Sequence, residues 1–307
     1  MDQSKYNLIT ILGHTAGGKT SVAANTAFRL NGEVISADSR QVYRDMDMGT
    51  GKDYKDYLVE GKEIKYHLID IHEPGYKYNV FEFQQDFIKV YQEIDKKGKV
   101  PILCGGSGLY IESVIKGYEM LEVPPDLVLR KELGEKSLEE LTDILKKYKK
   151  LHNKTDIDTK KRAIRAIEIE IYQEKNKNIW QEFQKINPLV MGIKFDRDSR
   201  RRRITERLET RLNAGMVKEV EELLNIGMKP DDLIYYGLEY KYITMFLTGV
   251  LSYNEMKERL NISIHQFAKR QMTWFRRMER QGIKIHWLDG NLSLDEKVAK
   301  IAKLFTS

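Results

Sequence analysis

The sequence predicts an α/β fold in which a parallel sheet is covered by helices on both faces. Three observations support this prediction. Short apolar runs alternate with helical patterns up to about residue 117, a glycine-rich loop joins the first of these runs to the first helix, and the chain is largely helical in pattern after residue 120. Near-continuous apolar strands that alternate with amphipathic helices are typical of a parallel sheet that is buried on both faces.

The individual elements follow from apolar runs and from helical spacing of apolar residues. Strands are predicted over residues 8–12, 34–37, 66–71, 100–104, 189–195 and 283–288. Helices are predicted over residues 21–30, 80–94, 138–151, 159–172, 200–226, 238–247 and 252–280. We therefore expect a phosphate-loop (P-loop) α/β domain over residues 1–120 and 186–307 with helices at its C-terminal end, and a helical insertion over residues 121–185.

Composition and charge are those of a globular protein. The chain has 307 residues, of which 41% are hydrophobic and 32% charged, and its formal net charge is +6. No apolar run approaches the roughly 20 residues of a membrane-spanning helix, and the first residues lack a signal-peptide pattern. The single cysteine, Cys104, excludes an internal disulfide and a cysteine-rich zinc site, and we interpret it as a buried residue at a strand end. We expect a cytoplasmic protein without a membrane partner.

The glycine-rich loop is the strongest functional signal in the chain. It reads Gly13-His14-Thr15-Ala16-Gly17-Gly18-Lys19-Thr20, a complete Gly-x-x-x-x-Gly-Lys-Thr phosphate loop between a predicted strand and a predicted helix. Backbone N–H groups and the dipole at a helix N-terminus favour a bound phosphate group. Lys19 adds a positive charge, and the Thr20 hydroxyl can hold Mg²⁺. The alternative is a glycine turn without a ligand, but strand, loop and helix all fit a site for a diphosphate or triphosphate group.

A second polar segment follows the second predicted strand and reads Ser36-Ala37-Asp38-Ser39-Arg40-Gln41-Val42-Tyr43. Ligands of parallel sheets gather at the carboxyl ends of the strands, so Asp38 is expected on the same rim as the phosphate loop. Its carboxylate has three interpretations: a partner of Mg²⁺, a general base, or the N-cap of a following helix.

Basic residues concentrate in the later helices. The three clusters are Lys160-Lys161-Arg162 with Arg165, Arg200 to Arg203 with Arg207 and Arg211, and Lys269-Arg270 with Arg276, Arg277 and Arg280. A single cluster is usually a solvated helix face, whereas three clusters beside a nucleotide-type loop favour a nucleic-acid partner. We interpret an adjacent stripe of Phe267, Trp274 and Met278 as core rather than as a base-stacking surface.

Together these motifs resemble those of bacterial tRNA dimethylallyltransferases, which are also called tRNA isopentenyltransferases, of the IPP transferase family. The resemblance spans nearly the whole chain in order and spacing. It is carried by the phosphate loop, by residues 36–43, 46–52, 68–70, 105–110 and 162–168, by Arg203, Ile204 and Arg207, and by residues 266–276. Such enzymes transfer a dimethylallyl group from its diphosphate to the exocyclic amine of the adenine 3′ of the anticodon in tRNA.

The resemblance implies a donor site at the phosphate loop, which would bind dimethylallyl diphosphate rather than ATP. Lys19 and a Mg²⁺ ion at Thr20 would neutralise the charge that grows as diphosphate leaves. Arg207 would join this clamp, Arg203 lies one helical turn before it, and Ser107 would assist from the second glycine turn.

On the acceptor side, the resemblance implies that Asp38 is the general base that takes a proton from the adenine amine. Ser39 and Gln41 would hold the extruded adenine, which is already unpaired in an anticodon loop. Contacts to the anticodon stem-loop are expected from Asp38, Ser39, Arg40, Gln41, Lys161, Arg162, Arg165, Lys269 and Arg270. The insertion would serve this tRNA contact, and we expect a monomer.

The chain departs from the family pattern in places. His14 stands where Pro is usual, and Gly237-Leu238-Glu239-Tyr240-Lys241 replaces the commoner Gly-Tyr-Arg/Lys-Glu. Two alternative functions stay open. A prenyltransferase that acts on free adenylate would share the loop and the aspartate, but the basic helices after residue 155 argue against it. A P-loop nucleotide kinase or regulatory nucleotide-binding module is disfavoured by the segment 38–41 and by the lack of a kinase-like arginine lid.

Overall fold

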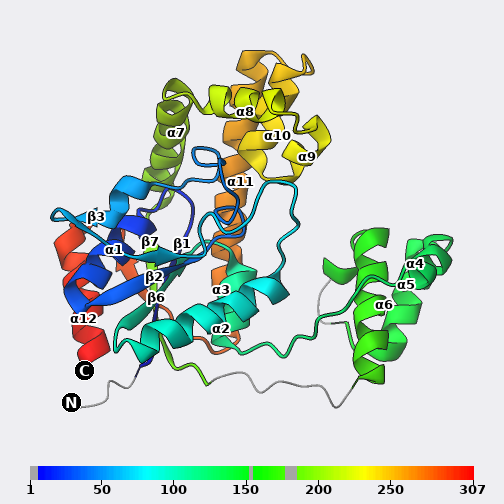
Figure 1. Cartoon of the computed structure of the whole chain (residues 1–307), viewed down its shortest axis with the longest axis horizontal. Coiled ribbons are helices and arrows are strands. Elements are labelled where there is room, and N and C mark those ends of the chain that lie inside the picture. Colours follow the sequence, from blue (N-terminus) through cyan, green and yellow to red (C-terminus); the bar gives the residue numbers. More distant parts are fainter. Residues whose placement is uncertain (1–5, 152–154, 177–184) are drawn as a thin grey trace. The chain divides into compact units, whose positions relative to one another are not determined.

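A six-stranded parallel sheet organises the larger part of the chain (Figure 1). The strand order is β5-β2-β6-β1-β7-β8. These strands are β1 (Leu8–Gly13), β2 (Gly32–Ala37), β5 (Tyr66–His67), β6 (Val100–Gly105), β7 (Pro188–Lys194) and β8 (His286–Asp289). In the register, Ile9 of β1 lies opposite Ile102 of β6 on one side and Leu189 of β7 on the other. The phosphate loop therefore leaves the sheet from one of its central strands.

Residues 6–151, 155–176 and 185–307 are described by the structure, which is a computed structural model. The chain separates into two units, Met1–Gly117 with Gln184–Ser307, and Tyr118–Phe183. The helices of the first unit are α1 (Lys19–Leu30), α2 (Val80–Lys96), α3 (Gly108–Ile115), α7 (Arg197–Asn213), α8 (Met216–Asn225), α9 (Pro230–Tyr235), α10 (Leu238–Leu247), α11 (Tyr253–Arg280) and α12 (Leu294–Thr306). This unit also carries a short antiparallel pair, β3 (Leu58–Val59) and β4 (Lys62–Glu63), and the 3-10 helix η1 (Tyr54–Tyr57).

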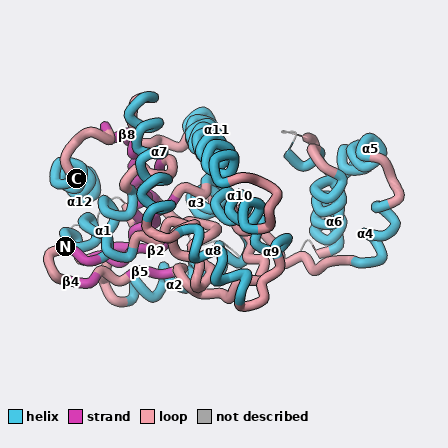
Figure 2. The backbone as a smooth tube through the Cα atoms, turned by 90° about the horizontal axis from the view of Figure 1, so that it is seen from above, coloured by secondary structure: helices cyan, strands magenta, loops and turns pink. Residues whose placement is uncertain are grey.

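Alternate side chains of the strands enter different cores on the two faces of the sheet. Leu8 and Leu12 of β1 pack in the core to which α2, α3 and α11 contribute. Ile9 and Ile11 pack in the core that contains residues of α1 and α12, which lie side by side in both views (Figures 1 and 2). All four side chains are fully buried. The alternation of a strand places successive side chains on opposite faces, so both faces of the sheet are covered by helices.

The second unit is helical. Its helices are α4 (Leu127–Gly134), α5 (Leu138–Tyr148) and α6 (Lys160–Lys175), with the 3-10 turn η2 (Thr155–Ile157). Leu133, Leu141, Leu145 and Ile167 form its own small core. Ser137 begins α5 with a complete capping box to Glu140.

Several predicted boundaries were wrong, for local reasons. The strand predicted over residues 66–71 ends at His67, because Leu68 and Asp70 have φ values of 61° and 54°, which no strand accommodates. The helix predicted over residues 200–226 is two helices, α7 and α8, that are separated at Gly215 with φ of 108°. The last strand begins at His286 rather than at Ile283, and α5 ends at Tyr148 rather than at Leu151. Helices α3, α4, α9 and α12 lie outside the predicted helix ranges.

Candidate active site

A large cavity opens at the carboxyl ends of β1, β2 and β6, with a volume of about 1250 Å³. Its walls come from the phosphate loop, the segments that follow β2 and β6, and residues of α7, α10 and α11. The predicted site residues that line it are Thr15, Ala16, Gly17, Gly18, Lys19, Thr20, Asp38, Ser39, Arg40, Gln41, Ser107, Arg203, Arg207 and Arg270. Gly13, His14 and Lys269 belong to the same unit but are not part of the cavity wall.

The phosphate loop turns from β1 into α1 and presents the start of that helix. Gly18, with φ of 70°, is the N-cap of α1, and Lys19 is the first helical residue. Within the described residues no side chain caps α1, and no acidic residue lies in its first turn, so the N-terminal N–H groups are left for an anion. The Lys19 ammonium donates to the carbonyl of His14 at 2.9 Å, and burial lowers the pKa of Lys19. The loop thus combines helix N–H groups with a partly desolvated ammonium.

His14 supports the loop from behind rather than facing the cavity. Its side chain is buried, and burial lowers its pKa to about 4, so the ring is neutral at pH 7. Nδ1 lies 2.6 Å from the carbonyl oxygen of Thr15, and the ring packs edge-on against Phe195 at 5.7 Å between centroids. The guanidinium of Arg203 lies 4.8 Å from the centre of the same Phe195 ring and donates through Nε to the carbonyl of Ala16 at 3.2 Å. His14 and Arg203 therefore hold the loop from two sides.

Asp38 lies at the end of β2, half-buried, in a turn rather than at the start of a helix. Its Oδ1 accepts the backbone N–H of Arg40 at 2.9 Å. Over residues 38–53 no α-helix begins, so the interpretation of Asp38 as a helix N-cap was wrong. The backbone N–H of Ser39 donates to the hydroxyl of Ser107 at 3.1 Å, which links the end of β2 to the second glycine turn. Asp38 and Ser107 are thereby fixed on the same rim.

The side chains of Arg40 and Gln41 already have partners within the protein. The Gln41 amide accepts a hydrogen bond from the Ser36 hydroxyl at 2.9 Å and donates to the carbonyl of Gly51 at 3.0 Å. The Arg40 guanidinium lies 4.9 Å from the centre of the Tyr235 ring. Tyr235 is 44% exposed and lines the cavity. The pair therefore offers an aromatic and cationic surface at the cavity wall.

Arg207 and Arg211 stand one turn apart on α7 and share a single carboxylate. Nη2 of Arg207 lies 3.0 Å from Oδ2 of Asp53, and Nη2 of Arg211 lies 3.0 Å from Oδ1. Nη1 of Arg207 also reaches the Thr15 hydroxyl of the phosphate loop at 3.4 Å. Burial lowers the pKa of Arg207, and the nearby positive charge of Arg211 adds to this effect. Neither Asp53 nor Arg211 was predicted to be a site residue.

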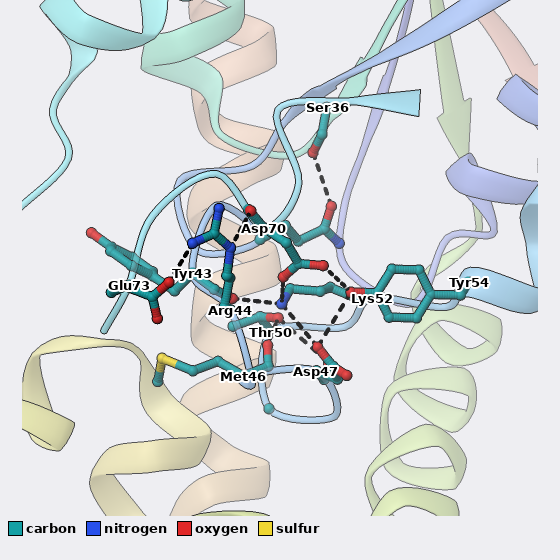
Figure 3. A network of polar contacts seen from close by, with 12 residues as sticks. Ser36, Tyr43, Arg44, Met46, Asp47, Thr50, Lys52, Tyr54, Asp70 and Glu73 are labelled. Atoms are coloured by element: carbon teal, nitrogen blue, oxygen red, sulfur yellow. Dashed lines mark hydrogen bonds and ion pairs between the residues drawn. The ribbon is translucent and has the colours of Figure 1, made fainter. Parts of the chain in front are cut away.

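The segment before Asp53 is anchored by a buried lysine (Figure 3). The side chain of Lys52 is fully buried, and its ammonium contacts the carboxylates of Asp47 and Asp70 and the carbonyl of Tyr43. The hydroxyl of Tyr54 donates to Asp70 and also approaches Asp47. Two carboxylates around one buried ammonium satisfy the charge that burial would otherwise leave uncompensated.

Glu219 of α8 holds the other side of the same segment. Its carboxylate accepts the backbone N–H groups of Asp47 at 3.0 Å, Met48 at 2.7 Å and Gly49 at 3.1 Å. The hydroxyl of Tyr240 donates to it at 2.7 Å. The loop over residues 47–53 is therefore fastened to the sheet side and to the helical side of the cavity.

Gln271 of α11 joins the two glycine turns and was missed as a site residue. Its Oε1 accepts the backbone N–H of Thr15 at 2.9 Å, and its Nε2 donates to the carbonyl of Gly106 at 2.9 Å. A signal for it exists in the sequence, because Gln271 shares a helical face with the core residues Ala268 and Phe275. A polar side chain in an apolar stripe requires hydrogen-bond partners.

Glu239, near the start of α10, adds another carboxylate to the cavity wall. Burial raises the pKa of this carboxyl, and the nearby Arg211 and Arg207 offset the shift only in part. It lies in the segment where the sequence departs from the family pattern.

The stripe on α11 was only partly predicted. Met278 is fully buried, as expected for core. Phe267 is 39% exposed and lines the cavity, so its assignment to the core was wrong. Trp274 is half-buried and packs against the core, as expected, but it also lines the cavity. The guanidinium of Arg270 lies 6.0 Å from the centre of the Phe267 ring, whereas Lys269 is exposed outside the cavity wall. Helical rotation explains this difference, because adjacent residues on a helix point about 100° apart.

The predicted basic residues of the insertion lie on α6, where their partners differ. Lys161 is exposed, and Arg162 is exposed and paired with Asp158. Arg165 is half-buried, contacts the carboxylate of Glu168 and donates to the carbonyl of Val123 at 2.9 Å. Arg165 therefore has an internal structural role, while Lys161 and Arg162 face solvent.

The residues present are compatible with a Mg²⁺ ion that is held mainly by its ligand. Among residues 6–151, 155–176 and 185–307 there is no group of three or more His, Cys, Asp or Glu side chains that could hold a metal. Mg²⁺ in phosphate-transfer sites usually takes only one or two protein oxygens beside phosphate oxygens and water. Thr20 and Asp38 both line the cavity and supply oxygens of that kind.

Comparisons with known proteins place this chain among the transferases. The family model described as IPP transferase matches residues 41–278. The chain belongs to the IPP transferase family, which confirms the resemblance found in the sequence.

Relatives of high identity cover nearly the whole chain. It is 59% identical over 302 residues to tRNA dimethylallyltransferase 1 of Parabacteroides distasonis, with 98% of each chain covered. It is also 59% identical over 300 residues to tRNA dimethylallyltransferase 2 of Phocaeicola vulgatus, again with 98% of each chain covered.

Solved structures of other proteins have the same fold as this chain. The full-length tRNA isopentenylpyrophosphate transferase of Bacillus halodurans is 31% identical, with a TM-score of 0.71 and coverage of 97% of this chain and 95% of the other. A eukaryotic dimethylallyltransferase acting on tRNA is 22% identical, with a TM-score of 0.79 and coverage of 96% and 77%, and it bears on the fold alone. The predicted α/β fold is confirmed. Within the part of the chain that the structure describes, no helix is both long and apolar enough to cross a membrane.

Proposed function

We propose that this protein transfers a dimethylallyl group from dimethylallyl diphosphate to the exocyclic amine of the adenine 3′ of the anticodon in tRNA, with release of diphosphate. The observation that carries the proposal is the shared cavity. A phosphate loop, a carboxylate at the end of β2 and an arginine pair on α7 all line it. Membership of the IPP transferase family and the names of the 59% identical relatives support the same activity.

The donor diphosphate would bind at the N-terminus of α1. The uncapped N–H groups of the helix and the Lys19 ammonium would meet its oxygens, and Arg207 would reach it from α7 beside Thr15. Negative charge on the diphosphate grows as the bond between C1 and oxygen breaks. Cations that are fixed around the leaving group therefore stabilise the transition state more than the ground state.

A bound Mg²⁺ ion would add to this neutralisation, with Thr20 as its proposed protein ligand and Asp38 within the same wall. The protein groups keep their own tasks: Lys19 and Arg207 hold the diphosphate, and the cavity positions the allyl group.

The acceptor adenine would lie next to Asp38. The amine nitrogen forms a bond to C1 of the allyl group while the C1–O bond breaks and its electron pair leaves with diphosphate. The Asp38 carboxylate takes the proton that the amine loses. An aryl amine is a weak nucleophile, so this proton transfer is expected to contribute roughly 10²–10⁴-fold to the rate.

The walls beyond Asp38 suit a nucleotide that has been turned out of a loop. Phe267, Trp274 and the Arg40–Tyr235 pair present aromatic and cationic surfaces along the cavity. Stacking on aromatic and guanidinium planes is the usual way in which proteins hold unpaired RNA bases. Exposed Lys161 and Arg162 in the insertion, and Lys269 on α11, are proposed to contact phosphates of the anticodon stem-loop.

Transfer of label tests this function against both alternatives. The protein is incubated with labelled dimethylallyl diphosphate and Mg²⁺ together with tRNA, AMP or ATP. We expect label in tRNA alone, and none in a matched tRNA in which the adenine 3′ of the anticodon is replaced by guanine. Label in AMP would instead establish the free-adenylate prenyltransferase, and label in neither acceptor would contradict the proposal.

A further inference from the structure

The contacts of Asp53 carry an inference about how the cavity releases diphosphate, and this inference rests on the proposed function. Asp53 stands at the N-cap position of η1, yet within the described residues its side chain makes no capping hydrogen bond there. Aspartate at such a position normally accepts N–H groups of the first turn. Here both carboxylate oxygens are directed to guanidinium groups of α7, at 3.0 Å each.

Burial distinguishes this pair from an ordinary surface ion pair. The side chains of Arg207 and Arg211 are 29% and 15% exposed, while that of Asp53 is 35% exposed. Two like charges are therefore brought together in a partly desolvated wall, with the carboxylate of Asp53 as the bridge between them. Desolvation of cations without full compensation leaves a site that attracts further negative charge.

The position of the Asp53 carboxylate is set by the surrounding contacts. Its neighbour Lys52 is held by two carboxylates (Figure 3). Glu219 fixes the backbone of residues 47–49 through three hydrogen bonds. Gly51, with φ of 82°, passes so close that an added Cβ would lie 2.7 Å from Nη2 of Arg207. The loop therefore follows the arginine pair closely and cannot swing away without breaking these interactions.

Arg207 lies between the Asp53 carboxylate and the phosphate loop. One guanidinium nitrogen contacts Asp53, and the other points to Thr15 of the phosphate loop. A diphosphate bound at that loop would share Arg207 with Asp53 and would be repelled by the fixed carboxylate. The repulsion weakens diphosphate binding and favours its departure.

We propose that Asp53 is the counter-anion of the diphosphate clamp: it holds Arg207 and Arg211 when the loop is empty, competes with bound diphosphate for them, and so accelerates release of the product. Asp53 is in this view a positioning residue with an electrostatic role. It does not touch the reacting atoms.

The experiment compares Asp53→Asn with the wild type, with inorganic diphosphate and Mg²⁺ as the probe. Asparagine is nearly isosteric and removes only the charge. We expect diphosphate to bind about fivefold to tenfold more tightly, as follows from removing one like charge at several ångströms in a partly solvated site. Its dissociation rate, measured by displacement with excess unlabelled diphosphate, should fall by a similar factor. A purely structural role for Asp53 makes the opposite prediction, because a loosened Arg207 would bind diphosphate more weakly.

Two further variants complete the design. Asp45→Asn removes the same charge from an exposed position between β2 and η1, and we expect diphosphate affinity within twofold of the wild type. Asp53→Glu keeps the charge and should keep near wild-type affinity. Unchanged or weaker diphosphate binding by a folded Asp53→Asn variant would overturn the inference. If Asp53→Asn does not fold, Asp53→Ser replaces it, and tighter diphosphate binding by that variant is again the expected result.

The label-transfer experiment separates this inference from the proposed function. A wild type that prenylates tRNA, combined with an Asp53→Asn variant that binds diphosphate no more tightly, rejects only the role of Asp53. A wild type that binds no diphosphate rejects both.

Discussion

Two arrangements of two arginines around one carboxylate occur in this protein, and they are inverted relative to each other. In the insertion, Glu168 is 2% exposed, and its partners Arg130 and Arg165 are 38% and 40% exposed. In the cavity the arginines Arg207 and Arg211 are the more buried members, and Asp53 is the more exposed one. The carboxylate is the buried group in the insertion, whereas the two arginines are the more buried groups in the cavity. The two arrangements therefore have different roles.

The pKa shifts follow the same inversion. Burial alone would raise the pKa of Glu168, but hydrogen bonds from Arg130 and Arg165 lower it below its usual value. In the cavity it is the pKa of Arg207 that is lowered, by burial and then by Arg211. A buried carboxylate with two cations is satisfied by the fold. Two buried arginines that share one carboxylate can still bind an anionic ligand. A cluster of basic residues in the sequence does not show which of these two situations applies.

The largest expected effect comes from substitution of Asp38, which belongs to neither of these two arrangements. We expect Asp38→Asn to fold and to bind dimethylallyl diphosphate, but to transfer the dimethylallyl group at least about a hundredfold more slowly, the lower range for loss of a general base. Single-turnover transfer to tRNA measures the rate, and calorimetry with the donor measures binding. Asp45→Asn serves as the charge-matched control. Full turnover by Asp38→Asn would remove Asp38 from the proposed chemistry.

Lys19→Ala tests the cation at the phosphate loop. Lys19 should contact diphosphate in the ground state and in the transition state, so donor affinity and turnover should both fall. A charge-assisted hydrogen bond contributes about 1.5–3 kcal/mol, so we expect a loss of about tenfold or more in donor affinity. The measurement is donor binding together with kcat and KM for the donor. Donor affinity and rates equal to the wild type would show that this loop is not the donor site.

Periodicity and motifs predicted the central strands, the phosphate loop and most helices, because these depend on local patterns. The strand β1 and the helix α1 follow directly from an apolar run and a glycine loop. The end of β5 depends on left-handed backbone at Leu68 and Asp70, and the apolar pattern of the run does not show which residue adopts a positive φ. Helix α12 was missed although the sequence carries a signal for it, because Ser293 and Glu296 form a capping box before an amphipathic run. Helices α4 and α9 have only 8 and 6 residues, so their apolar periodicity is weaker.

The candidate site was predicted where a motif carries the chemistry, and missed where only tertiary structure does. Asp53 and Arg211 meet across 158 positions of the chain, and Gln271 reaches the phosphate loop across 256. Phe267 looked like core because its neighbours on α11 are core. These interactions arise from packing α7 and α11 beside the sheet, which periodicity along one helix does not specify.

Glu168→Gln tests the arrangement of Glu168, Arg130 and Arg165 in the insertion. It leaves Arg130 and Arg165 without a charged partner beside a buried side chain, and we expect the insertion to lose about 1–2 kcal/mol, less than for a fully buried pair because both arginines are partly exposed. Hydrogen exchange over residues 118–151 and 155–176 should report the loss, while residues of the sheet should stay protected as in the wild type. Asp53→Asn is the matched control and should leave the insertion unchanged.

The pH dependence of the same readout gives an independent check. The folded pKa of Glu168 is lowered, so its stabilising contribution is fully present above the unfolded pKa of about 4.3 and is lost as pH falls through the folded value. Protection of the insertion in the wild type should therefore decline below pH ~4. In Glu168→Gln this part of the decline should be absent. Identical pH profiles would show that Glu168 does not hold the insertion together.

The smallest expected effect concerns the exposed basic residues of α6, which have no part in either arginine pair. Neutralising Lys161 and Arg162 together by substitution with Gln should weaken tRNA binding and reduce the slope of log affinity against log salt by about 0.7–0.9 for each RNA phosphate that the variant no longer neutralises. Donor binding should stay within twofold. Filter binding of tRNA at several salt concentrations measures both affinity and slope, and Lys175→Gln, an exposed lysine at the end of the same helix, is the control. If Lys161 and Arg162 are only solvent-exposed and do not contact RNA, the wild type, the double variant and Lys175→Gln will have the same slope. A reduced slope in the double variant alone would show that Lys161 and Arg162 bind RNA phosphates. Arg165 differs from them because its guanidinium already contacts Glu168 and Val123 within the insertion.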